Sequence, residues 1–537
     1  MTSAVGDGAE RPSPAPPMQW DAWGDGSRAA HLPPGAKQIL ALVLKGKPRG
    51  IARRAAEAAT LTPSRLDVAS LNELATLAPT TADDAVRILH LGGRSTPDLL
   101  ARRRDEVQAA PDAVVSPEDH TQTLAVLAHC AEHDIVVVPF GGGTSVVGGV
   151  DPDAGGHRAV ITLDLSRTAG LIALDEVSLL ATFGAGTTGP QAEELLSRHG
   201  LTLGHFPQSF EFASLGGFAA TRSSGQASRG YGRFDDLVHA LVVATPVGEL
   251  RLGRAPASAA GPDLRELILG SEGAFGVITE VTVRVRLKPT RTAYASWTFP
   301  DFDAGAEALR EATQRGIQPT VVRLSDETET RINAVMGGHL TRMNGCLAIA
   351  TADGATADGD EGAAELARLD EVFRAHGAKP RGEDPARSWE RGRFDAPGLR
   401  DTLMDIGVLA ETLETATIWA ALPELKAAVT AALTDALDGR PQIMCHISHV
   451  YPAGASLYFT VIAPLDADPV AQWARAKDAA SRAIVASGGT ITHHHAVGTD
   501  HRSYLTEEIG DLGVEVLRAV KRTLDPRGIL NPGKLIP

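Results

Sequence analysis

Three consecutive histidines, His493, His494 and His495, form the sharpest chemical feature of the 537-residue sequence. A neutral imidazole titrates near pH 7 and can accept or return a proton, so general acid–base chemistry is one interpretation. On a strand, neighbouring side chains face opposite ways, so His493 and His495 would share a face while His494 points away. Two ligands on one face are fewer than zinc usually takes, so we predict no metal site. A metal ion and an ordinary histidine cluster stay open as alternatives.

Tyr458, Arg323 and Arg400 are further side chains with chemistry to offer. The Tyr458 phenol can exchange a proton, although Leu457-Tyr458-Phe459 is also typical of a core strand. A fixed guanidinium can meet two phosphate oxygens at once, which suits an arginine to phosphate binding. Most arginines are simply solvated, so these residue types alone do not decide the function.

A glycine-rich loop, Pro139–Gly149, follows the apolar and β-branched stretch Ile135–Val138. Without side chains, consecutive N–H groups can converge on one anion such as a pyrophosphate. No Lys-Ser or Lys-Thr follows at the P-loop position, and the glycines do not fall as G-x-G-x-x-G. The loop is therefore neither a Walker nor a Rossmann loop, and a tight turn at a strand end is the alternative.

Three more glycine-rich regions abut strands further along the chain. Gly184–Gly189 is a literal G-x-G-x-x-G, but the next predicted strand, Leu201–His205, carries no acidic residue for a ribose hydroxyl. Pro207–Phe218, with Thr221–Gln226 after it, and Gly270–Gly276 set short polar groups among glycines. That composition is typical where backbone lies against a cofactor. Together the loops predict one extended ligand cradle.

Composition excludes several classes of protein. Lys plus Arg number 51 and Asp plus Glu 66, so a net charge of −15 disfavours a generic nucleic-acid binder. Cys130, Cys346 and Cys445 form no Cys-x-x-Cys pair, which disfavours a disulfide framework and fits a reducing cytosol. No apolar run reaches the roughly 18 residues of a membrane span. Contact with a membrane surface stays open.

We expect an α+β protein with five segments. Residues 1–17, rich in Pro, Ala, Gly and Ser, are expected to be disordered, and residues 18–106 to form a helical N-terminal segment. Residues 107–289, with short strands and glycine loops, form a first domain. Residues 290–502 alternate helices and strands and form a second, α+β domain. Residues 503–537 give a helix and a turn-rich tail that packs back on an earlier domain.

The order of these loops resembles the flavoprotein superfamily of vanillyl-alcohol oxidase and p-cresol methylhydroxylase, and within it the alkyldihydroxyacetonephosphate synthase family. The resemblance runs from about Trp20 to the C-terminus. It rests on eight specific strings: Pro139–Val146, Gly204-His205, Leu215–Gly217, Gly270–Thr279, Val322–Leu324, Glu411–Thr415, Gly454–Phe459 and Gly488–Gly498. It implies a two-part FAD-binding domain of the p-cresol methylhydroxylase type over 107–289 and a cap, or substrate, domain over 290–502.

The resemblance also implies which residues bind FAD. The pyrophosphate would lie in the cradle of Gly141, Gly142, Gly143, Thr144, Ser145, Val146 and Val147. The rest of the cofactor would be lined by Pro207, Gln208, Ser209, Phe210, Glu211, Phe212, Ala213, Thr221, Arg222, Ser223, Ser224, Glu272, Gly273, Ala274, Phe275, Gly276, Val277 and Ile278. Neither Cys346 nor Cys445 carries an attachment signature, so we expect noncovalent FAD.

In that family the acyl group of acyl-dihydroxyacetonephosphate is replaced by a fatty alcohol through a flavin N5 adduct, with no net oxidation, in ether-lipid synthesis. The resemblance implies that one of His493, His494 and His495 removes the C1 proton. It implies that Tyr458 is the active-site tyrosine, that Arg323 matters for activity and that Arg400 binds the substrate phosphate. This chain departs from the family pattern at Ala496, where Gly is usual, and around Ser448–Val450.

The alternative function is a FAD-linked oxidase or dehydrogenase of a 2-hydroxy acid, because fold alone does not separate the two activities. A non-enzymatic flavin-binding or membrane-associated scaffold does not explain the matched His, Tyr and Arg residues. We expect a phosphorylated, lipid-like substrate, a homodimer and a cytoplasmic location. The chain ends Lys534-Leu535-Ile536-Pro537, without a peroxisomal signal.

Overall fold

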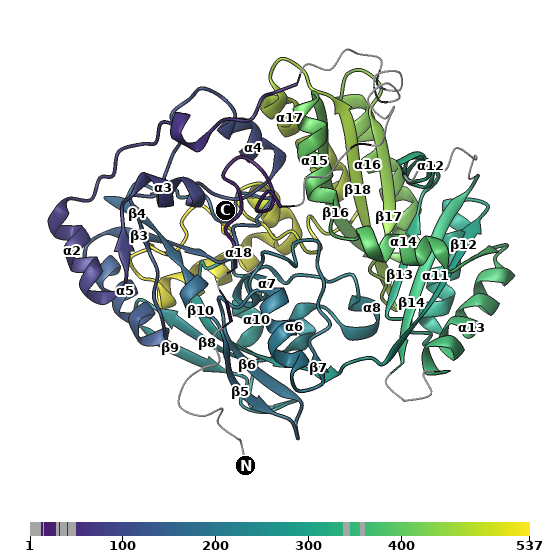
Figure 1. Cartoon of the computed structure of the whole chain (residues 1–537), viewed down its shortest axis with the longest axis horizontal. Coiled ribbons are helices and arrows are strands. Elements are labelled where there is room, and N and C mark those ends of the chain that lie inside the picture. Colours follow the sequence, from purple (N-terminus) through teal and green to yellow (C-terminus); the bar gives the residue numbers. More distant parts are fainter. Residues whose placement is uncertain are drawn as a thin grey trace.

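The structure is a computed structural model in which a first domain lies beside a cap domain (Figure 1). It describes residues 12–13, 15–27, 32, 40, 44, 50–336, 344–354 and 360–537. Most of the expected disordered lead, and the start of the expected helical segment, lie outside these residues.

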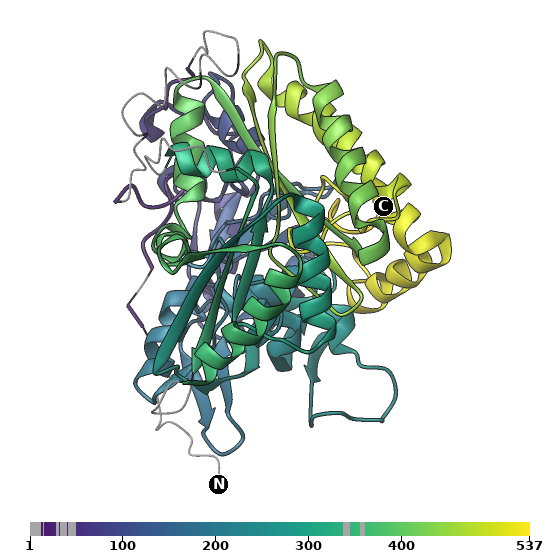
Figure 2. The same cartoon turned by 90° about the vertical axis from the view of Figure 1, so that its right-hand side faces the viewer.

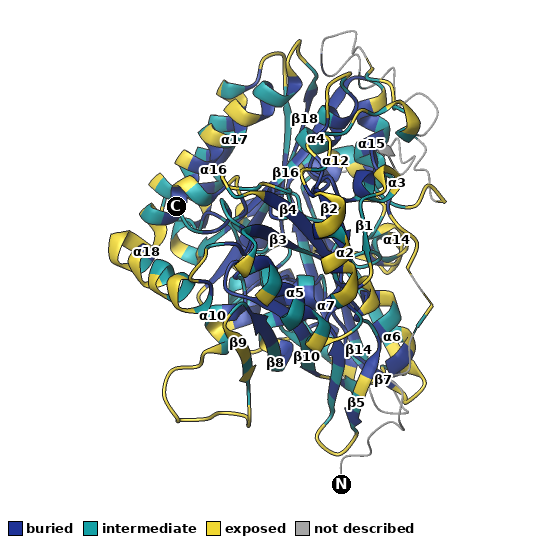
Figure 3. Cartoon of the chain, turned by 90° about the vertical axis from the view of Figure 1, so that its left-hand side faces the viewer, coloured by how far each residue is buried: buried dark blue, intermediate teal, exposed yellow. Residues whose placement is uncertain are grey.

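A small, mostly parallel sheet carries the first glycine loop. Its order is β1-β2-β4-β3, with strands at Thr80–Thr81, Ala113–Val115, Ala159–Asp164 and Ile135–Phe140. Helix α5 (His120–Glu132) connects β2 to β3, and it begins where Asp119 accepts the Gln122 N–H at 2.8 Å. Val136, Val137 and Val138 are fully buried, which explains the unbroken apolar stretch (Figure 3).

The N-terminal segment is not wholly helical. It holds α2 (Val68–Leu77), α3 (Asp84–Arg87) and α4 (Thr96–Arg102), but its strand β1 pairs with β2 at the sheet edge. Leu74 of α2 packs into the core of the same sheet. At the other end, the Thr96 hydroxyl donates to the Ala410 carbonyl of the cap at 2.9 Å. This segment therefore joins the two domains.

A second, antiparallel sheet completes the first domain. Its order is β5-β6-β10-β8-β9, with strands at Leu171–Asp175, Leu180–Gly184, Val277–Arg284, Val238–Thr245 and Gly248–Leu252. Helices α6 (Gly189–Ser197), α7 (Leu215–Thr221) and α9 (Phe234–Leu237) share its hydrophobic core. The predicted strand at 201–205 is shorter than expected, at Leu201–Thr202, because Glu193 accepts the N–H groups of Leu203 and Gly204.

The cap is a seven-stranded antiparallel sheet in the order β15-β12-β14-β13-β17-β18-β16. The strands are Lys379–Gly382, Arg291–Phe299, Cys346–Gly354, Val321–Ser325, Gln442–Ile447, Gly454–Pro464 and Val408–Ile418. One face packs against α11 (Phe302–Gln314), α13 (Asp360–Ala375), α16 (Leu422–Ala436) and α17 (Pro469–Ala486), which Figure 2 shows from their own side. Leu457, Phe459 and Val461 of β18 are buried in this core, so Tyr458 faces the other way.

The C-terminal segment returns to the first domain. Helix α18 (Leu505–Leu524) has an exposed outer side and is kinked at Gly510, whose φ is 73° (Figure 3). After it, Val137 of β3 donates to the Ile529 carbonyl and accepts the Asn531 N–H. The Asn531 amide donates to the carbonyls of Gly149 and Glu272, at 3.0 and 2.7 Å, and so ties two glycine-rich loops together. Among the described residues, no helix is long and apolar enough to cross a membrane.

Candidate active site

The three consecutive histidines lie in a loop, Thr490–Gly498, which we call the histidine loop. It is wrapped around the buried carboxylate of Glu414 on β16. The N–H groups of His494 and His495 donate to Glu414 Oε1 at 3.1 and 2.8 Å, and the His493 N–H donates to Oε2. The predicted strand is wrong, because three successive N–H groups reach one carboxylate only if the backbone bends.

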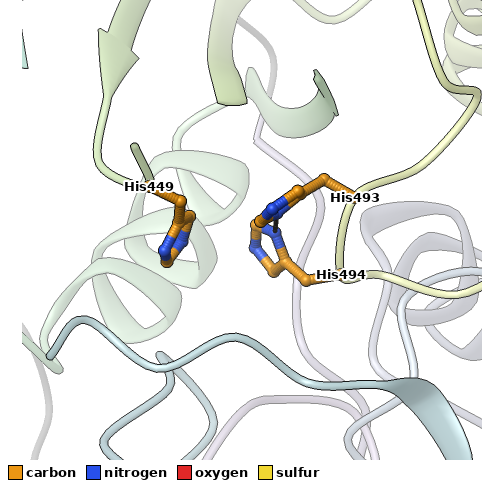
Figure 4. A group of neighbouring side chains, drawn as sticks. All are labelled: His449, His493 and His494. Atoms are coloured by element: carbon orange, nitrogen blue, oxygen red, sulfur yellow. Dashed lines mark hydrogen bonds between the residues drawn. The ribbon is translucent and has the colours of Figure 1, made fainter. Parts of the chain in front are cut away.

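The bend brings His493 and His494 together instead of separating them. Their Nδ1 atoms are 3.0 Å apart, and the His449 ring stacks on His493 with centroids 5.0 Å apart. Ligand nitrogens of these three residues lie within 4.8 Å of one another (Figure 4). The expectation of two converging imidazoles is therefore also wrong. The spacing admits a metal ion, although hydrogen bonds within the protein already engage Nδ1 of each ring.

Burial holds these imidazoles neutral at pH 7. It lowers the pKa of His449, His493 and His494 below the ordinary value, and the Arg233 guanidinium adds to this effect. For His495, burial lowers the pKa to about 3. Burial alone would raise the pKa of Glu414, but the three histidines and Thr492 outweigh it and keep its pKa well below the usual range. The loop thus offers neutral bases around a fixed carboxylate.

Tyr458 lies directly opposite Glu414 on the neighbouring strand of the cap sheet. Its strand neighbours in register are His446 of β17 and Glu414 of β16. Its ring stacks on His446 at 4.8 Å between centroids, and lies 6.0 Å from His494 and 5.8 Å from His495. Burial raises the pKa of Tyr458 to about 12, so the phenol keeps its proton. The sheet therefore brings a proton donor beside the neutral bases.

Arg323, on β13, contacts the histidine on which Tyr458 stacks. Its guanidinium donates to Glu329 at 2.5 Å and contacts His446 Nδ1 at 2.9 Å. Burial alone would raise the pKa of Glu329, but Arg323 and His446 hold it well below its usual range. Arg323 is thus held behind His446, the ring on which Tyr458 stacks.

Arg400 lies elsewhere, on α15 (Ala396–Asp405). Its guanidinium donates to Asp401 at 3.0 and 3.1 Å and to the Arg94 carbonyl at 2.5 Å. The Arg94 N–H in turn donates to the Ser145 carbonyl of the first glycine loop. Arg400 is therefore placed near the first glycine loop, and within the described residues it makes no hydrogen bond to the histidine loop.

The glycine-rich loops Pro139–Gly149, Pro207–Phe218 and Gly270–Gly276 pack on one another, and we call them the glycine cradle. A Cβ on Gly142 would lie 1.9 Å from the Phe212 carbonyl oxygen, and one on Gly141 2.2 Å from Ser214 Oγ. Only glycine fits such contacts. Among the described residues, Gln208 Nε2 and Ser271 Oγ are buried without a hydrogen-bond partner, as expected of groups that meet a polar ligand.

Two residues predicted to line the cofactor also contact the cap. Ser224 Oγ lies 3.1 Å from His449 Nδ1, and Glu272 accepts the N–H groups of Val497 and Gly498 at 3.1 and 2.9 Å. Burial raises the pKa of Glu272 to about 7. Arg222 instead pairs with Asp235 and Glu266, which leaves its guanidinium engaged by carboxylates. The histidine loop is therefore anchored on the cradle as well as on Glu414.

Sequence reasoning missed Glu414, His449, Tyr451 and Arg233. Tyr451 bonds His493 Nε2 at 2.7 Å, and Arg233 donates to the His493 carbonyl at 3.1 Å. The available signal was the pair of acidic residues, Glu411 and Glu414, inside an otherwise apolar or Thr-rich strand, because a carboxylate is costly to bury without partners. All four lie far in the sequence from the histidines that they contact.

Comparison with known proteins first defines the class. The family of FAD-binding domains matches residues 111–253, and that of FAD linked oxidases, C-terminal domain, matches residues 288–535. The fold of p-cresol methylhydroxylase is similar, with a TM-score of 0.67 and 16% identity over 87% of this chain and 96% of that one. The predicted α+β fold, with a FAD-binding domain of this type, is confirmed. The protein is a FAD-dependent enzyme.

Relatives with higher sequence identity define a narrower family. The alkyldihydroxyacetonephosphate synthase of Trypanosoma brucei brucei is 33% identical over 485 residues, which are 85% of this chain and 78% of that protein. A solved structure of an alkyldihydroxyacetonephosphate synthase superposes with a TM-score of 0.81 and 27% identity, over 96% of this chain and 98% of that one. The chain belongs to the alkyldihydroxyacetonephosphate synthase family, as the sequence motifs predicted.

A more distant relative is named for a different activity. The mitochondrial D-lactate dehydrogenase [cytochrome] of Arabidopsis thaliana is 29% identical over 449 residues, which are 80% of this chain and 74% of that protein. Similarity to this relative is the reason why oxidation of a 2-hydroxy acid stays the alternative function.

Proposed function

We propose that the protein exchanges the acyl group of acyl-dihydroxyacetonephosphate for a fatty alcohol, without net oxidation. The observation that carries the proposal is the meeting of Tyr458, a protonated phenol, with the neutral imidazoles of the histidine loop. A transfer reaction needs one group to take a proton and another to return one, and this pair supplies both. Membership of the synthase family supports the choice of substrate.

FAD would be held by the glycine cradle, where it would supply an electrophilic flavin ring to the substrate carbon. The cradle offers backbone N–H groups and the unpartnered Gln208 and Ser271. The three cysteines are buried and free, and burial raises the pKa of the Cys445 thiol, so we propose that the cofactor is bound noncovalently.

One of His493, His494 and His495 removes the proton from C1. Their burial keeps them unprotonated, and Glu414, close beneath them, stabilises the cation that forms on proton uptake. Tyr458 then exchanges its proton with the departing carboxylate or the entering alcohol. Arg323 keeps the ring of His446, and with it Tyr458, in place.

Arg400 remains our proposed ligand of the substrate phosphate. Asp401 fixes the plane of its guanidinium, and Arg94 links it to the first glycine loop. A guanidinium held in this way is already oriented to donate two hydrogen bonds to phosphate oxygens. We also propose that the protein is a homodimer in the cytoplasm and that its lipid-like substrate brings it to membrane surfaces, on the family resemblance.

The test is incubation of the purified yellow protein with acyl-dihydroxyacetonephosphate and a fatty alcohol, without oxygen or any electron acceptor. We expect an ether product and one equivalent of fatty acid. The competing activity predicts instead that a 2-hydroxy acid bleaches the flavin until an electron acceptor restores it. The relationship to D-lactate dehydrogenase makes that acid a required comparison.

A further inference from the structure

Another pair of histidines lies on helix α5 of the first domain. His129 is in the last turn of α5 and His133 follows its end, so the two residues, four apart, project from the same face of the helix. Their rings stack with centroids 4.0 Å apart. Glu73 of α2 lies beside them because α2 packs against α5, with Leu74 and Cys130 in one core (Figure 1). Two separate helices thus bring two imidazoles and a carboxylate together.

An unpartnered nitrogen of His129 points to a ligand at this place. His129 Nε2 is buried and, among the described residues, has no hydrogen-bond partner. It lies 3.9 Å from Glu73 Oε2, which is too far for a hydrogen bond. Two ligands of one tetrahedral zinc ion, each bonded at about 2.0–2.1 Å, lie roughly 3.4 Å apart. A shift of about half an ångström would therefore bring the two atoms to the separation of two metal ligands.

The hydrogen bonding of His133 fixes which of its ring nitrogens can bind a metal ion. A carbonyl can only accept, so the 2.9 Å contact between His133 Nδ1 and the His129 carbonyl places the proton on Nδ1 and leaves the lone pair on Nε2. Metal-binding histidines usually hold their second ring nitrogen in this way. One ligand atom from each of Glu73, His129 and His133 lies within 4.8 Å of the other two. The three side chains thus form a set of two nitrogen ligands and one oxygen ligand.

The charges around this group suit a bound cation. Glu73 supplies a negative charge within the ligand set itself. Glu132 and Arg158 also act on His129, and because their signs are opposite their effects oppose each other. Burial, together with His133, lowers the pKa of His129, so its imidazole is neutral at pH 7, as a metal ligand must be.

We propose that Glu73, His129 and His133 bind one divalent transition-metal ion, with water in the fourth position. Two imidazoles and a carboxylate suit zinc, whereas magnesium and calcium prefer oxygen ligands alone. The ion would join α2 to α5 and so stabilise the sheet on which both helices pack. We predicted no metal site from the sequence, in which only the two histidines are close together; the packing of α2 on α5 supplies the third ligand.

The ion would lie at the end of β3 opposite the first glycine loop. His133 comes just before β3 (Ile135–Phe140), whereas the loop Pro139–Gly149 is at the far end of this strand. The six residues of β3 span about 17 Å. We therefore expect the metal ion to change the stability of the first domain and not the flavin or the chemistry.

Calorimetric titration with zinc alone tests the site. The FAD-loaded protein should bind one zinc ion per chain with a Kd of about 10 µM, because three protein ligands, one of them on an exposed glutamate, hold the ion only moderately. At 100 µM zinc the melting temperature should rise by about 2–4 °C with the flavin spectrum unchanged. At this affinity, protein purified without added metal carries no ion here, so EDTA alone changes nothing. Absence of binding, or a flavin spectrum that changes with binding, would overturn the proposal.

Two substitutions assign the ligands. His133→Gln and Glu73→Gln should each weaken zinc binding at least about tenfold and remove the rise in melting temperature. Glu73 is exposed, so its substitution leaves the fold intact. The matched control is His199→Gln, which removes another histidine–glutamate pair of the first domain, with Glu176 at 3.1 Å, and should bind zinc as the wild type does. Undiminished binding in both His133→Gln and Glu73→Gln would overturn the assignment.

X-ray absorption at the zinc edge distinguishes this site from the histidine loop. With one equivalent of zinc we expect two imidazoles and oxygen ligands at about 2.0–2.1 Å, and one imidazole in His133→Gln. Three imidazoles would place the ion among His449, His493 and His494 instead and would overturn the proposal. Neither result depends on which reaction the enzyme catalyses.

Discussion

The two halves of the site are built in opposite ways. The glycine cradle works by the absence of side chains: at Gly142 even a methyl group would meet a carbonyl oxygen at 1.9 Å. The cap half works by buried charge: Glu414 accepts three N–H groups of the histidine loop, and Glu329 pairs with Arg323. Added volume should therefore damage the cradle, whereas lost charge should damage the cap.

The largest effect should come from Gly142→Ala. The neighbouring Phe212 backbone cannot move aside as a side chain could, so the loops must separate. We expect FAD affinity to fall about 100-fold or more, equivalent to about 3 kcal/mol, as measured by the flavin absorbance that stays with the protein on dialysis. Gly217→Ala is the control: its Cβ would meet its nearest neighbour, Ser214 Oγ, at 3.4 Å, and FAD should stay bound.

Glu414→Gln should damage the cap almost as much while leaving the cradle intact. The amide nitrogen cannot accept the N–H groups that the carboxylate accepts from the histidine loop. We expect kcat to fall about 100-fold and the free energy of unfolding to fall by about 2–4 kcal/mol, measured with urea at neutral pH. Glu424→Gln, at an exposed position on α16, should change neither quantity. Full activity in Glu414→Gln would show that the charge is dispensable.

Arg323→Lys should have a smaller effect, because it keeps the positive charge and loses only the planar set of donors of the guanidinium. An ammonium cannot hold both Glu329 and His446 in their present geometry. We expect kcat to fall about tenfold with FAD fully retained, as steady-state kinetics would measure. Arg482→Lys alters an exposed pair with Asp478 and serves as the control. An unaltered kcat would remove Arg323 from the account of the site.

The buried histidines should make stability depend on pH. The pKa of His495 is about 3 in the folded protein and near 6.5 when unfolded, so the unfolded chain binds more protons between these values. Stability is then fully present above pH 6.5 and falls as the pH drops. Each such histidine contributes a slope of about 1.4 kcal/mol per pH unit. His495→Gln should lower the slope by that amount in urea unfolding from about pH 5.5 to 4, where the unfolded imidazole is protonated and the folded one is not; an unchanged slope would contradict the burial argument.

Chelation should have no effect. His449, His493 and His494 could surround a metal ion by their spacing, but our account uses them as bases and hydrogen-bond partners. Dialysis against EDTA should leave both activity and the melting temperature as they were. Loss of either, restored by zinc, would replace the acid–base account of this cluster with a metal site.

Sequence reasoning reached the cradle because its signals are local. A glycine loop directly after a buried strand, as at Pro139–Gly149, can be read from a few adjacent residues. The alternation in β18 likewise predicts a strand, although not which face Tyr458 occupies. The cap half was harder, because Glu414 lies 79 residues from His493 and Tyr451 lies 42 residues from it. The histidine loop was predicted as a strand because its bend is imposed by that distant carboxylate.

The proposed function requires that the site transfers a group rather than electrons. The most direct measurement is anaerobic flavin absorbance during titration with acyl-dihydroxyacetonephosphate, then a fatty alcohol, and separately with 2-hydroxy acids. We predict a spectral change with the lipid that the alcohol reverses, with no oxygen consumed when air is admitted. Lasting bleaching by a hydroxy acid, reversed only by an electron acceptor, would contradict the account.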